Sequence, residues 1–331
     1  MKRTISRRLL AGLATAALAS GLFVHPDQEA LSAPSASSAA DERDYVSLVD
    51  PWVEADIARF FFFQSASQPF GFVKLRPDTS THNSRGTGYR KNENEVKGFS
   101  HIHDWQISGV QIMPTTGADV PKLDGDTGWQ SHVEHDETEI VEPGYHRLHL
   151  DRYGIDAELT ATERVGMHRY TYDEAGPSEI LINLGGRLGE AEMENAHVTK
   201  VSQNELEGYV VQHGDRYRGR HQTKLFFTIR FDRPFDSLRG WSGGELVDGG
   251  QPVDEVAGDD MGVYVRYDDL AAGDQVQVKV GLSLTGTRGR GRTSRLNCRI
   301  GISTGSGRSR RSIGMTCWAG STSRVAPSSS R

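Results

Sequence analysis

The chain is best understood from one stretch, residues 98–109, which reads Gly98-Phe99-Ser100-His101-Ile102-His103-Asp104-Trp105-Gln106-Ile107-Ser108-Gly109. Side chains of an extended strand alternate between two faces. The stretch therefore predicts a strand that places His101, His103 and Trp105 on the same face. The alternative is a buried strand whose histidines form hydrogen bonds with neighbouring backbone.

The indole ring of Trp105 beside the imidazoles of His101 and His103 would suit the binding of a neutral sugar. The C–H groups of the sugar pack on the aromatic ring, while its hydroxyls need hydrogen-bond donors and acceptors around the ring. This interpretation makes the stretch a candidate glycan-binding surface.

Further sequence blocks flank this stretch in both directions. They are Val49-Asp50-Pro51-Trp52, Gln68-Pro69-Phe70-Gly71-Phe72-Val73-Lys74-Leu75-Arg76-Pro77-Asp78-Thr79, Pro143-Gly144-Tyr145, Tyr153-Gly154-Ile155-Asp156-Ala157-Glu158-Leu159-Thr160-Ala161-Thr162 and Val165-Gly166-Met167-His168-Arg169-Tyr170. Together with Gly98–His103 they resemble, in the same order, the motifs of glycoside hydrolase family 92, the calcium-dependent exo-acting α-mannosidases. The resemblance covers residues 45–285, which correspond only to the N-terminal β-sandwich domain of that family.

The resemblance implies that the two domains of the family have different roles. In this family the catalytic acids and the calcium ion belong to a following (α/α) barrel, and the sandwich lends residues to the rim of the sugar site. We therefore expect a fragment of a secreted, inverting α-mannosidase of the α-1,2 type, inactive alone and without a metal site of its own. Its partners would be a mannose-containing glycan and the barrel domain. The candidate glycan contacts are Tyr89, His101, His103, Asp104 and Trp105.

Two departures from the family pattern affect loops that would face the substrate. Asp104-Trp105-Gln106-Ile107-Ser108-Gly109 follows the second histidine where the family commonly has Leu-Ser-Gly-Thr-Gly. The four phenylalanines of residues 60–63 replace a glycine-rich loop. The preferred glycosidic linkage therefore stays open.

Composition and patterning predict an all-β fold between residues 41 and 285. A chain of 331 residues with 36% hydrophobic and 25% charged residues is typical of a soluble globular protein. Short apolar runs separated by Gly, Pro and Asp predict strands at 71–75, 110–113, 145–150, 155–162, 165–172, 180–184, 206–212, 224–231, 263–267 and 276–283. So many short strands predict an antiparallel β-sandwich. The run 225–229 is nearly all apolar and predicts a central strand buried on both faces.

The N-terminus has the features of a bacterial export signal, and residues 1–40 are assigned to a signal peptide and a small-residue linker. Lys2, Arg3, Arg7 and Arg8 precede an apolar run over residues 9–24, and small residues follow at 32–40. The Arg7-Arg8 pair is compatible with the twin-arginine route. We expect a cleaved signal, a secreted protein and no membrane span in the mature chain.

Charge separates the middle of the chain from its end. Residues 1–40 carry a net charge of +2 and residues 286–331 carry +10, which leaves −18 for the middle of a chain whose total is −6. An acidic middle repels phosphate backbones and argues against nucleic-acid binding.

Residues 286–331 hold ten Arg, no Asp, Glu or Lys, and no apolar periodicity. We interpret them as out-of-frame translation, with a disordered basic tail as the alternative. Cys298 and Cys317 both lie there, and a disulfide between them is chemically permitted.

Weaker signals leave two rival functions open. The first is a free-standing carbohydrate-binding sandwich, which would bind glycans through Trp105. The second is a hydrolase that uses carboxylates of the sandwich itself, such as Glu134, Glu137 or Glu139. The polar run from His132 to Glu139 could ligate a metal but is more typical of a solvated loop. Asp124 and Asp126 resemble the start of a calcium loop that lacks its bidentate glutamate.

Overall fold

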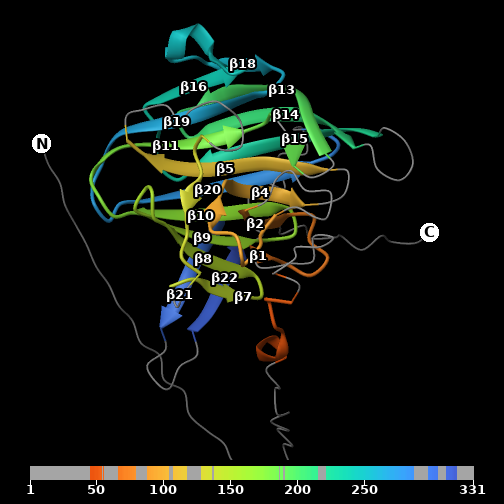
Figure 1. The fold of residues 1–331 in the computed structure, drawn as a ribbon, viewed down its shortest axis with the longest axis vertical. Coiled ribbons are helices and arrows are strands. Elements are labelled where there is room, and N and C mark those ends of the chain that lie inside the picture. The colour runs from red at the N-terminus through yellow and green to blue at the C-terminus, as the bar shows by residue number, and fades with distance from the viewer. Residues whose placement is uncertain are drawn as a thin grey trace, which may run out of the picture. The chain divides into compact units, whose positions relative to one another are not determined.

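The described chain is built almost wholly of β-strands, and every described strand pairing is antiparallel (Figure 1), which confirms the prediction of an antiparallel all-β fold. The structure, a computed structural model, describes residues 45–53, 55, 66–79, 88–103, 107–117, 128–135, 138–185, 187–188, 191–214, 221–286, 297–304 and 311–318. All of them belong to the second of the two units, Met1–Asp44 and Tyr45–Arg331, into which the chain divides. The predicted export segment therefore lies outside the described residues.

One layer of the sandwich is an eight-stranded sheet with the strand order β1-β2-β4-β5-β11-β19-β16-β17. Its strands are β1 (Ala66–Ser67), β2 (Lys74–Asp78), β4 (Gly98–His103), β5 (Ser108–Thr116), β11 (Gly176–Asn183), β19 (Met261–Leu270), β16 (Ser237–Ser242) and β17 (Glu245–Leu246). Strand β4, which carries the histidines, lies between β2 and β5 and is buried along its whole length.

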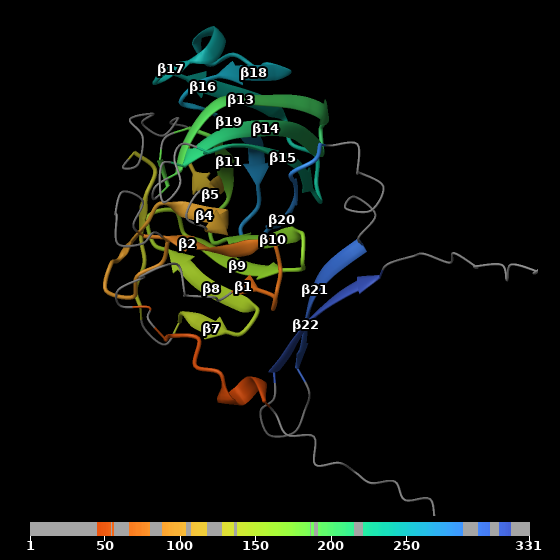
Figure 2. The same ribbon diagram turned by 90° about the vertical axis from the view of Figure 1, so that its right-hand side faces the viewer.

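The second layer has ten strands, nine of them in the order β12-β13-β14-β15-β20-β10-β9-β8-β7, with β18 paired to β13. They are β12 (Arg187–Leu188), β13 (Ala191–Ser202), β14 (Glu205–Gly214), β15 (His221–Phe231), β20 (Gln275–Ser283), β10 (Val165–Tyr172), β9 (Ile155–Ala161), β8 (Tyr145–Leu150), β7 (Ile140–Glu142) and β18 (Glu255–Gly258). Figure 2 shows the two sheets lying face to face. Two short strands, β3 (Glu95–Val96) and β6 (Ser131–His132), form a small separate sheet, and the 3-10 turns are η1 (Val46–Leu48) and η4 (Val247–Gly250).

The core fills the space between the two layers with alternate residues of each strand. In β20 the apolar residues are buried and the polar residues between them are not, with the buried set being Val276, Val278, Val280 and Leu282. Such period-two burial is what a half-exposed antiparallel strand requires. Each fully buried aliphatic side chain contributes on the order of 2 kcal/mol by leaving water, which makes this alternation the main determinant of strand register.

Two details of the fold differ from the sequence-based expectation. The strand β15 is central, between β14 and β20, but it is buried on one face only, because Leu225, Phe227 and Ile229 alternate with partly exposed residues. The prediction that this run is buried on both faces was wrong. Leu225, Phe227 and Ile229 supply the core face, whereas Phe226 contacts Tyr209 and Lys224 on the outward face.

Within residues 286–331, interpreted from the sequence as out-of-frame translation or as a disordered basic tail, the structure describes a separate antiparallel hairpin. Its strands are β21 (Asn297–Thr304) and β22 (Arg311–Trp318), and its register pairs Cys298 with Cys317. A lone two-stranded hairpin is marginally stable in water, since it has no second layer to bury a face. The presence of this hairpin does not test whether residues 286–331 are translated in the correct reading frame, so an out-of-frame origin of this segment stays a prediction. No helix among the described residues is long and apolar enough to cross a membrane.

Candidate functional site

The first histidine of the β4 stretch lies in the interior of the sandwich. Nδ1 of His101 donates to the carbonyl of Val110 at 2.6 Å, and its Nε2 lies 2.9 Å from Nε2 of His168. The hydroxyl of Tyr170 lies 2.8 Å from Nδ1 of His168. Because a carbonyl only accepts, His101 carries its proton on Nδ1, His168 donates from Nε2, and Tyr170 donates to His168. Every polar atom of this buried chain is used, and both imidazoles are neutral.

Burial explains why the two rings stay neutral. Desolvation lowers the pKa of His101 to about 4, although the bond to Val110 opposes the shift. It also lowers the pKa of His168 well below the ordinary value, and the nearby His101 ring adds to the effect because two positive charges side by side would repel each other. Gly166 of β10 lies directly against the His101 ring, and a Cβ at this position would overlap it. His101 is therefore an interior histidine bonded to backbone.

The second histidine joins a different group of side chains. Nδ1 of His103 donates to the carbonyl of Lys74 at 2.9 Å, and its Nε2 lies 2.5 Å from Oδ1 of Asp78. The other oxygen of Asp78 accepts from Ser100 at 2.5 Å and from Gln111 at 2.8 Å. Both nitrogens of the ring face acceptors, so His103 and Asp78 share the proton between them. Burial, followed by the charge of Arg76, lowers the pKa of His103, and Asp78 opposes the shift.

The two histidines therefore do not form one wall. His101 faces the second sheet, whereas His103 turns to Asp78 at the end of β2, and both side chains are essentially inaccessible to solvent. Both histidine side chains lie in the interior, and from there they can support a binding surface. Direct contact of either ring with a glycan stays a prediction.

The Asp78 group lies where chain segments leave and re-enter the sheet. The amide of Thr79 donates to the carbonyl of Gly88 at 3.1 Å. A Cβ on Gly88, whose φ is +103°, would lie 3.0 Å from Cδ2 of His103 and 3.1 Å from Nε of Arg76. Only glycine adopts this backbone conformation without strain and leaves room for both side chains.

Asp104 and Trp105 lie outside the described residues, so their contact with a glycan also stays a prediction. The residues on either side of them are fixed. His103 is held by Asp78 and pairs with Ser108 across the β4–β5 hairpin. Gly109, with a φ of +98°, lies so close to Met193 of β13 that a Cβ would overlap it. The hairpin end that carries Asp104 and Trp105 is thus anchored at its described residues to both sheets.

Tyr89 belongs to a third group, built around Glu139. The carboxylate of Glu139 accepts hydrogen bonds from Tyr89 at 2.8 Å, from His135 at 2.8 Å and from His146 at 2.7 Å. Burial would raise the pKa of Glu139, but the bonds from His135, His146 and Tyr89 outweigh it and lower the pKa to about 2. Trp52 packs on the other side of Tyr89, with ring centroids 6.0 Å apart. Tyr89 is wholly buried, and its predicted glycan contact stays a prediction.

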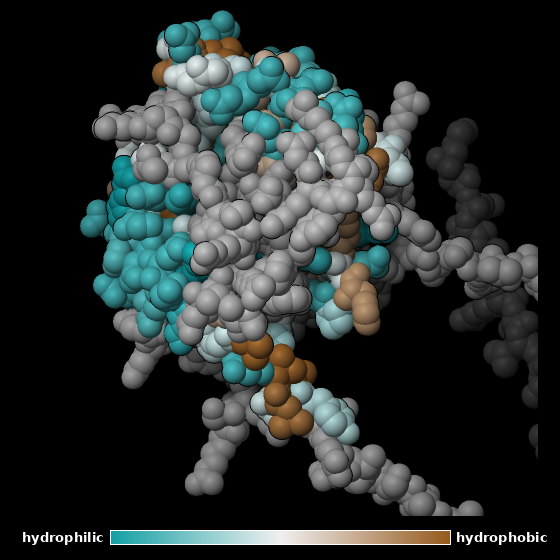
Figure 3. All heavy atoms as spheres, turned by 45° about the vertical axis from the view of Figure 1, so that its right-hand side comes forward, coloured by the Kyte–Doolittle hydropathy of each residue, from teal (hydrophilic) through white to brown (hydrophobic). Residues whose placement is uncertain are grey.

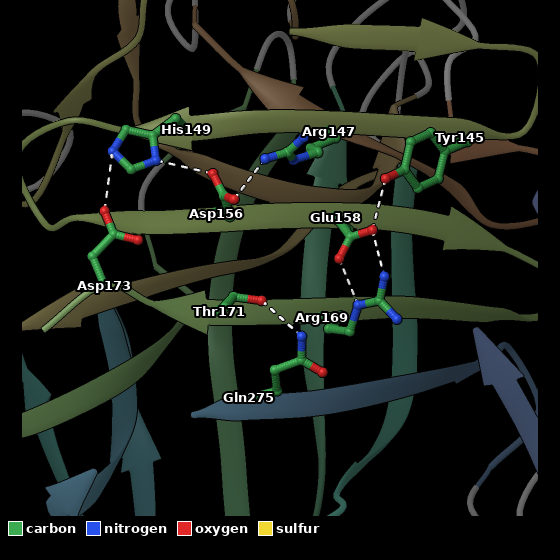
Figure 4. Close-up of polar contacts among 9 residues, drawn as sticks. All are labelled: Tyr145, Arg147, His149, Asp156, Glu158, Arg169, Thr171, Asp173 and Gln275. Carbon is green, nitrogen blue, oxygen red and sulfur yellow. Dashed lines mark hydrogen bonds and ion pairs between the residues drawn. The ribbon is translucent and has the colours of Figure 1, made fainter. Parts of the chain in front are cut away.

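The outward face of the ten-stranded sheet carries a ladder of polar residues that the sequence analysis did not single out (Figure 4). Glu158 accepts from Tyr145 at 2.7 Å and from two nitrogens of Arg169 at 2.5 Å, and Asp156 accepts from Arg147 at 2.7 Å and His149 at 3.0 Å. We call this set the outer ladder; its members are Tyr145, Arg147, His149, Asp156, Glu158, Arg169, Thr171, Asp173 and Gln275. Strand alternation could have indicated it, since residues 145, 147 and 149 of β8 share one face. Its charges compensate one another across strands, an arrangement that stabilises the sheet.

The described carboxylates and imidazoles form one candidate metal-binding group. Among the described residues, the one group of three or more His, Cys, Asp or Glu residues whose ligand atoms lie within 4.8 Å of one another is His132, Glu134 and Asp151. Calcium takes six to eight oxygen ligands. One imidazole and two carboxylates on an exposed surface do not fit that requirement. Asp124, Asp126 and Glu137 lie outside the described residues.

Three sequence blocks that are far apart along the chain meet in these networks. Asp78 comes from the Pro-Asp block, His101 and His103 come from the central stretch, and His168 with Tyr170 comes from the block that begins at Val165. Asp78, His168 and Tyr170 were part of the quoted motifs but were not proposed as site residues. The motif itself was the signal that could have identified them.

Comparison with known proteins identifies the family of this domain. A sequence model of the glycosyl hydrolase family 92 N-terminal domain matches residues 48–283. No curated protein matches the chain in sequence. The solved GH92 α-mannosidase BT3965 from Bacteroides thetaiotaomicron, in complex with mannoimidazole, is 25% identical with a TM-score of 0.68, over 77% of this chain and 34% of that chain.

Two further solved structures share the fold. The inverting GH92 mannosidase BT2199 from Bacteroides thetaiotaomicron VPI-5482 is 15% identical with a TM-score of 0.59, over 76% of this chain and 33% of that chain. The GH92 family glycosyl hydrolase ccman5 is 22% identical with a TM-score of 0.57, over 78% of this chain and 38% of that chain. The chain therefore spans about a third of the length of these proteins. It belongs to glycosyl hydrolase family 92, of which it carries the N-terminal domain.

Proposed function

We propose that the chain forms the sugar-facing N-terminal part of a secreted α-mannosidase that acts on α-1,2-linked, mannose-containing glycans. The observation that carries the proposal is that strand β4 joins three family motifs: His103 is bonded to Asp78 at the base of the β4–β5 hairpin, and His101 is bonded to His168 of the block that begins at Val165. Such convergence supports a site that needs a fixed geometry at this end of the sandwich.

In this proposal the buried histidines act as positioning residues. Asp78 fixes His103, which ends β4 and directly precedes Asp104 and Trp105 in the sequence. Trp105 would pack on the C–H face of a mannose residue, and Asp104 would accept hydrogen bonds from its hydroxyls. Rigid supports of this kind reduce the entropy lost when a sugar binds.

Hydrolysis is proposed to need residues outside this chain. An inverting glycosidase uses one protonated carboxyl as the general acid and one carboxylate that activates water. Glu139, whose pKa is lowered to about 2, is ionised at neutral pH and holds three hydrogen bonds, so it does not suit the role of general acid. The catalytic carboxylates and the calcium that the family requires would come from the (α/α) barrel that follows in family members.

The second candidate function is a free-standing carbohydrate-binding module. The observation that favours it is the completeness of the sandwich core, because both sheets bury their inner faces against each other. A module of this kind would bind mannose-type glycans through the same turn and would not need a following domain.

Two assays on the purified full-length chain test the proposal. The first measures mannose release from α-1,2-linked mannobiose, and the second measures binding of the same sugar by titration calorimetry. We expect weak binding without hydrolysis, and loss of binding in Trp105→Ala but not in the matched tryptophan variant Trp241→Phe. Release of mannose that persists after repeated purification would instead support a hydrolase within the sandwich, and the variants Glu134→Gln, Glu137→Gln and Glu139→Gln would identify its carboxylate.

A further inference from the structure

Strand β5 contains a backbone conformation that its residue type does not favour. Five non-glycine residues of the described chain have a positive φ, and three of them are Asn or Asp, which tolerate the left-handed region. The other two are Phe70, which is fully exposed, and Val110, which is fully buried and has a φ of +49°. Figure 3 shows brown, hydrophobic atoms gathered at the lower end of the molecule, where Figure 1 draws η1, and Val110 is no part of that exposed apolar surface. A left-handed valine is energetically unfavourable, because its branched side chain crowds its own carbonyl.

The backbone of Val110 is held by His101. Its carbonyl accepts a hydrogen bond from Nδ1 of His101 at 2.6 Å, and its side chain belongs to the hydrophobic core. If Val110 returned to the extended φ of about −140°, either its carbonyl would leave the His101 ring or the chain before it would change direction. A carbonyl and a ring N–H that separate in the interior find no water to replace the lost bond. Since His101 in turn contacts His168 of β10 at 2.9 Å, the strained conformation in one sheet is maintained from the other sheet.

The residue before Val110 is fixed from the same side. Gly109 has a φ of +98°, and a Cβ at this position would overlap the side chain of Met193 on β13. Only glycine combines this φ with so close an approach. Gly109 and Val110, which we call the left-handed pair, are therefore both held by residues that lead to the ten-stranded sheet.

The left-handed pair determines how the chain enters β5. A change of φ at Val110 from +49° to an extended value would redirect Ser108 and Gly109 and break their pairing with β4. We infer that His101 and Val110 are positioning residues that orient the segment at residues 104–105, to which the proposed function assigns the binding of a mannose-type glycan. Strained backbone of this kind persists only where its surroundings hold it, and it is often found at functional sites. The inference rests on the proposed function for its ligand but not for the contact between His101 and Val110.

A comparison of glycine with alanine at one position tests whether Val110 is left-handed and strained. Both substitutions remove the buried side chain, but only glycine adopts a positive φ without strain. We expect Val110→Gly to unfold at a higher urea concentration than Val110→Ala. The matched control is Val265 of β19, which is equally buried and is not left-handed, so Val265→Gly should unfold at a lower concentration than Val265→Ala. Greater stability of the alanine variant at both positions would overturn the inference.

Two substitutions of His101 test whether this residue holds Val110. In His101→Asn the side-chain amide can take the place of Nδ1 and donate to Val110, whereas His101→Leu has no donor. In a chain whose five tryptophans carry ¹⁵N, the indole signal of Trp105, assigned from Trp105→Phe, reports on the oriented segment. We expect this signal to move in His101→Leu and to stay near its wild-type position in His101→Asn, while the Trp241 signal is unchanged in both. An unmoved Trp105 signal in His101→Leu would contradict the positioning role. If His101→Leu does not fold, the order of the glycine and alanine variants at Val110 decides the inference.

Titration of α-1,2-linked mannobiose separates this inference from the proposed function. We expect His101→Leu to bind about tenfold more weakly than wild type, because a segment without a fixed orientation loses more entropy on binding. His101→Asn should recover most of the lost affinity. Equal affinities of wild type and His101→Leu would overturn the positioning role. A wild-type chain that does not bind mannobiose would contradict the proposed function, and the indole signals would still decide whether His101 orients the segment.

Discussion

The molecule contains two polar arrays of similar composition, one buried in the interior and one on the outward face of the ten-stranded sheet. In the outward array Tyr145 and Glu158 are buried, but Arg147, His149 and Asp156 are partly exposed to water. Buried within the sandwich are two groups, His101 with His168 and Tyr170, and Asp78 with Ser100, His103 and Gln111; we call the two together the buried network. The outer ladder runs across β8, β9, β10 and β20 and pairs Arg147 with Asp156 and Arg169 with Glu158 (Figure 4). Both connect neighbouring strands through hydrogen bonds. Their energetic consequences differ, because a polar atom that loses its partner in the interior cannot turn to water.

This difference distinguishes the array that depends on family-specific sequence blocks from the array that does not. The outer ladder follows from strand alternation and compensates its own charges, so it supports any sheet of this kind. The buried network needs particular partners from three distant sequence blocks, and it ends beside the β4–β5 turn. We therefore expect substitutions in the buried network to be costly and equivalent substitutions in the outer ladder to be tolerated.

The largest effect is expected for Asp78→Ala. The substitution leaves His103, Ser100 and Gln111 without their common acceptor in the interior, so we expect the free energy of unfolding to fall by about 3 to 5 kcal/mol. The matched control Asp156→Ala removes the acceptor of Arg147 and His149 on the outer ladder, where water can replace it, and should cost about 1 kcal/mol or less. Urea denaturation of both variants measures the difference. Equal losses would refute the contrast between the two arrays.

The next effect is a dependence of stability on pH. The folded pKa of His101 is about 4, below the ordinary 6.5, so the unfolded chain takes up a proton first as the pH falls. The stabilising contribution is complete above pH 6.5 and is lost between 6.5 and 4, at about 1.4 kcal/mol per pH unit. Between pH 6.5 and 5 we expect a loss of about 2 kcal/mol from His101 and a further loss from His168. In His101→Leu the slope should become clearly shallower, and an unchanged slope would contradict the assignment of a neutral buried His101.

A smaller effect is expected for Gly166→Ala, whose new methyl group would overlap the ring of His101. We expect a loss of about 2 kcal/mol, the usual cost of overpacking a core. In the background His101→Ala the ring is absent, and the same substitution should cost much less. Thermal unfolding of the four proteins of this double-mutant cycle gives the coupling free energy. Additive losses would show that Gly166 and His101 do not press on each other.

The smallest contrast compares two tyrosines. Tyr170→Phe removes the donor to Nδ1 of His168 in the interior and should cost about 1 to 2 kcal/mol. Tyr145→Phe removes one of three donors to Glu158, which keeps both bonds from Arg169, and should cost about 0.5 kcal/mol. Chemical denaturation of both variants at the same pH measures the difference between their free energies of unfolding. A larger loss for Tyr145→Phe would reverse the ranking of the two arrays.

Periodicity predicted most of the sandwich, and its failures have physical causes. The strands β8 and β10 were predicted with their observed bounds, because their alternation is uninterrupted. Strand β13 was missed: the register of Ala191–Ser202 shifts between Glu194 and His197, where Asn195 has a φ of +45°. A bulge changes the phase of the alternation, so the apolar residues no longer share one face in the sequence pattern.

The candidate site was predicted less completely than the fold. Strand alternation correctly assigns His101 and Ser100 to opposite faces of the strand. It does not identify His168, which lies 67 residues away in the sequence, as the partner of His101. Partners of this kind depend on which strands become neighbours, and local patterns carry no such information. Motif resemblance did contain Asp78 and His168, though without their roles.

The central claim is the proposal that the buried network supports a sugar-binding segment at residues 104–105 and that the outer ladder does not. The most direct test is titration of α-1,2-linked mannobiose into Asp78→Asn and Asp156→Asn, at a temperature where circular dichroism shows both to be folded. We predict that Asp78→Asn weakens binding at least tenfold, while Asp156→Asn binds like wild type. Equal affinities in the two variants would contradict the claim.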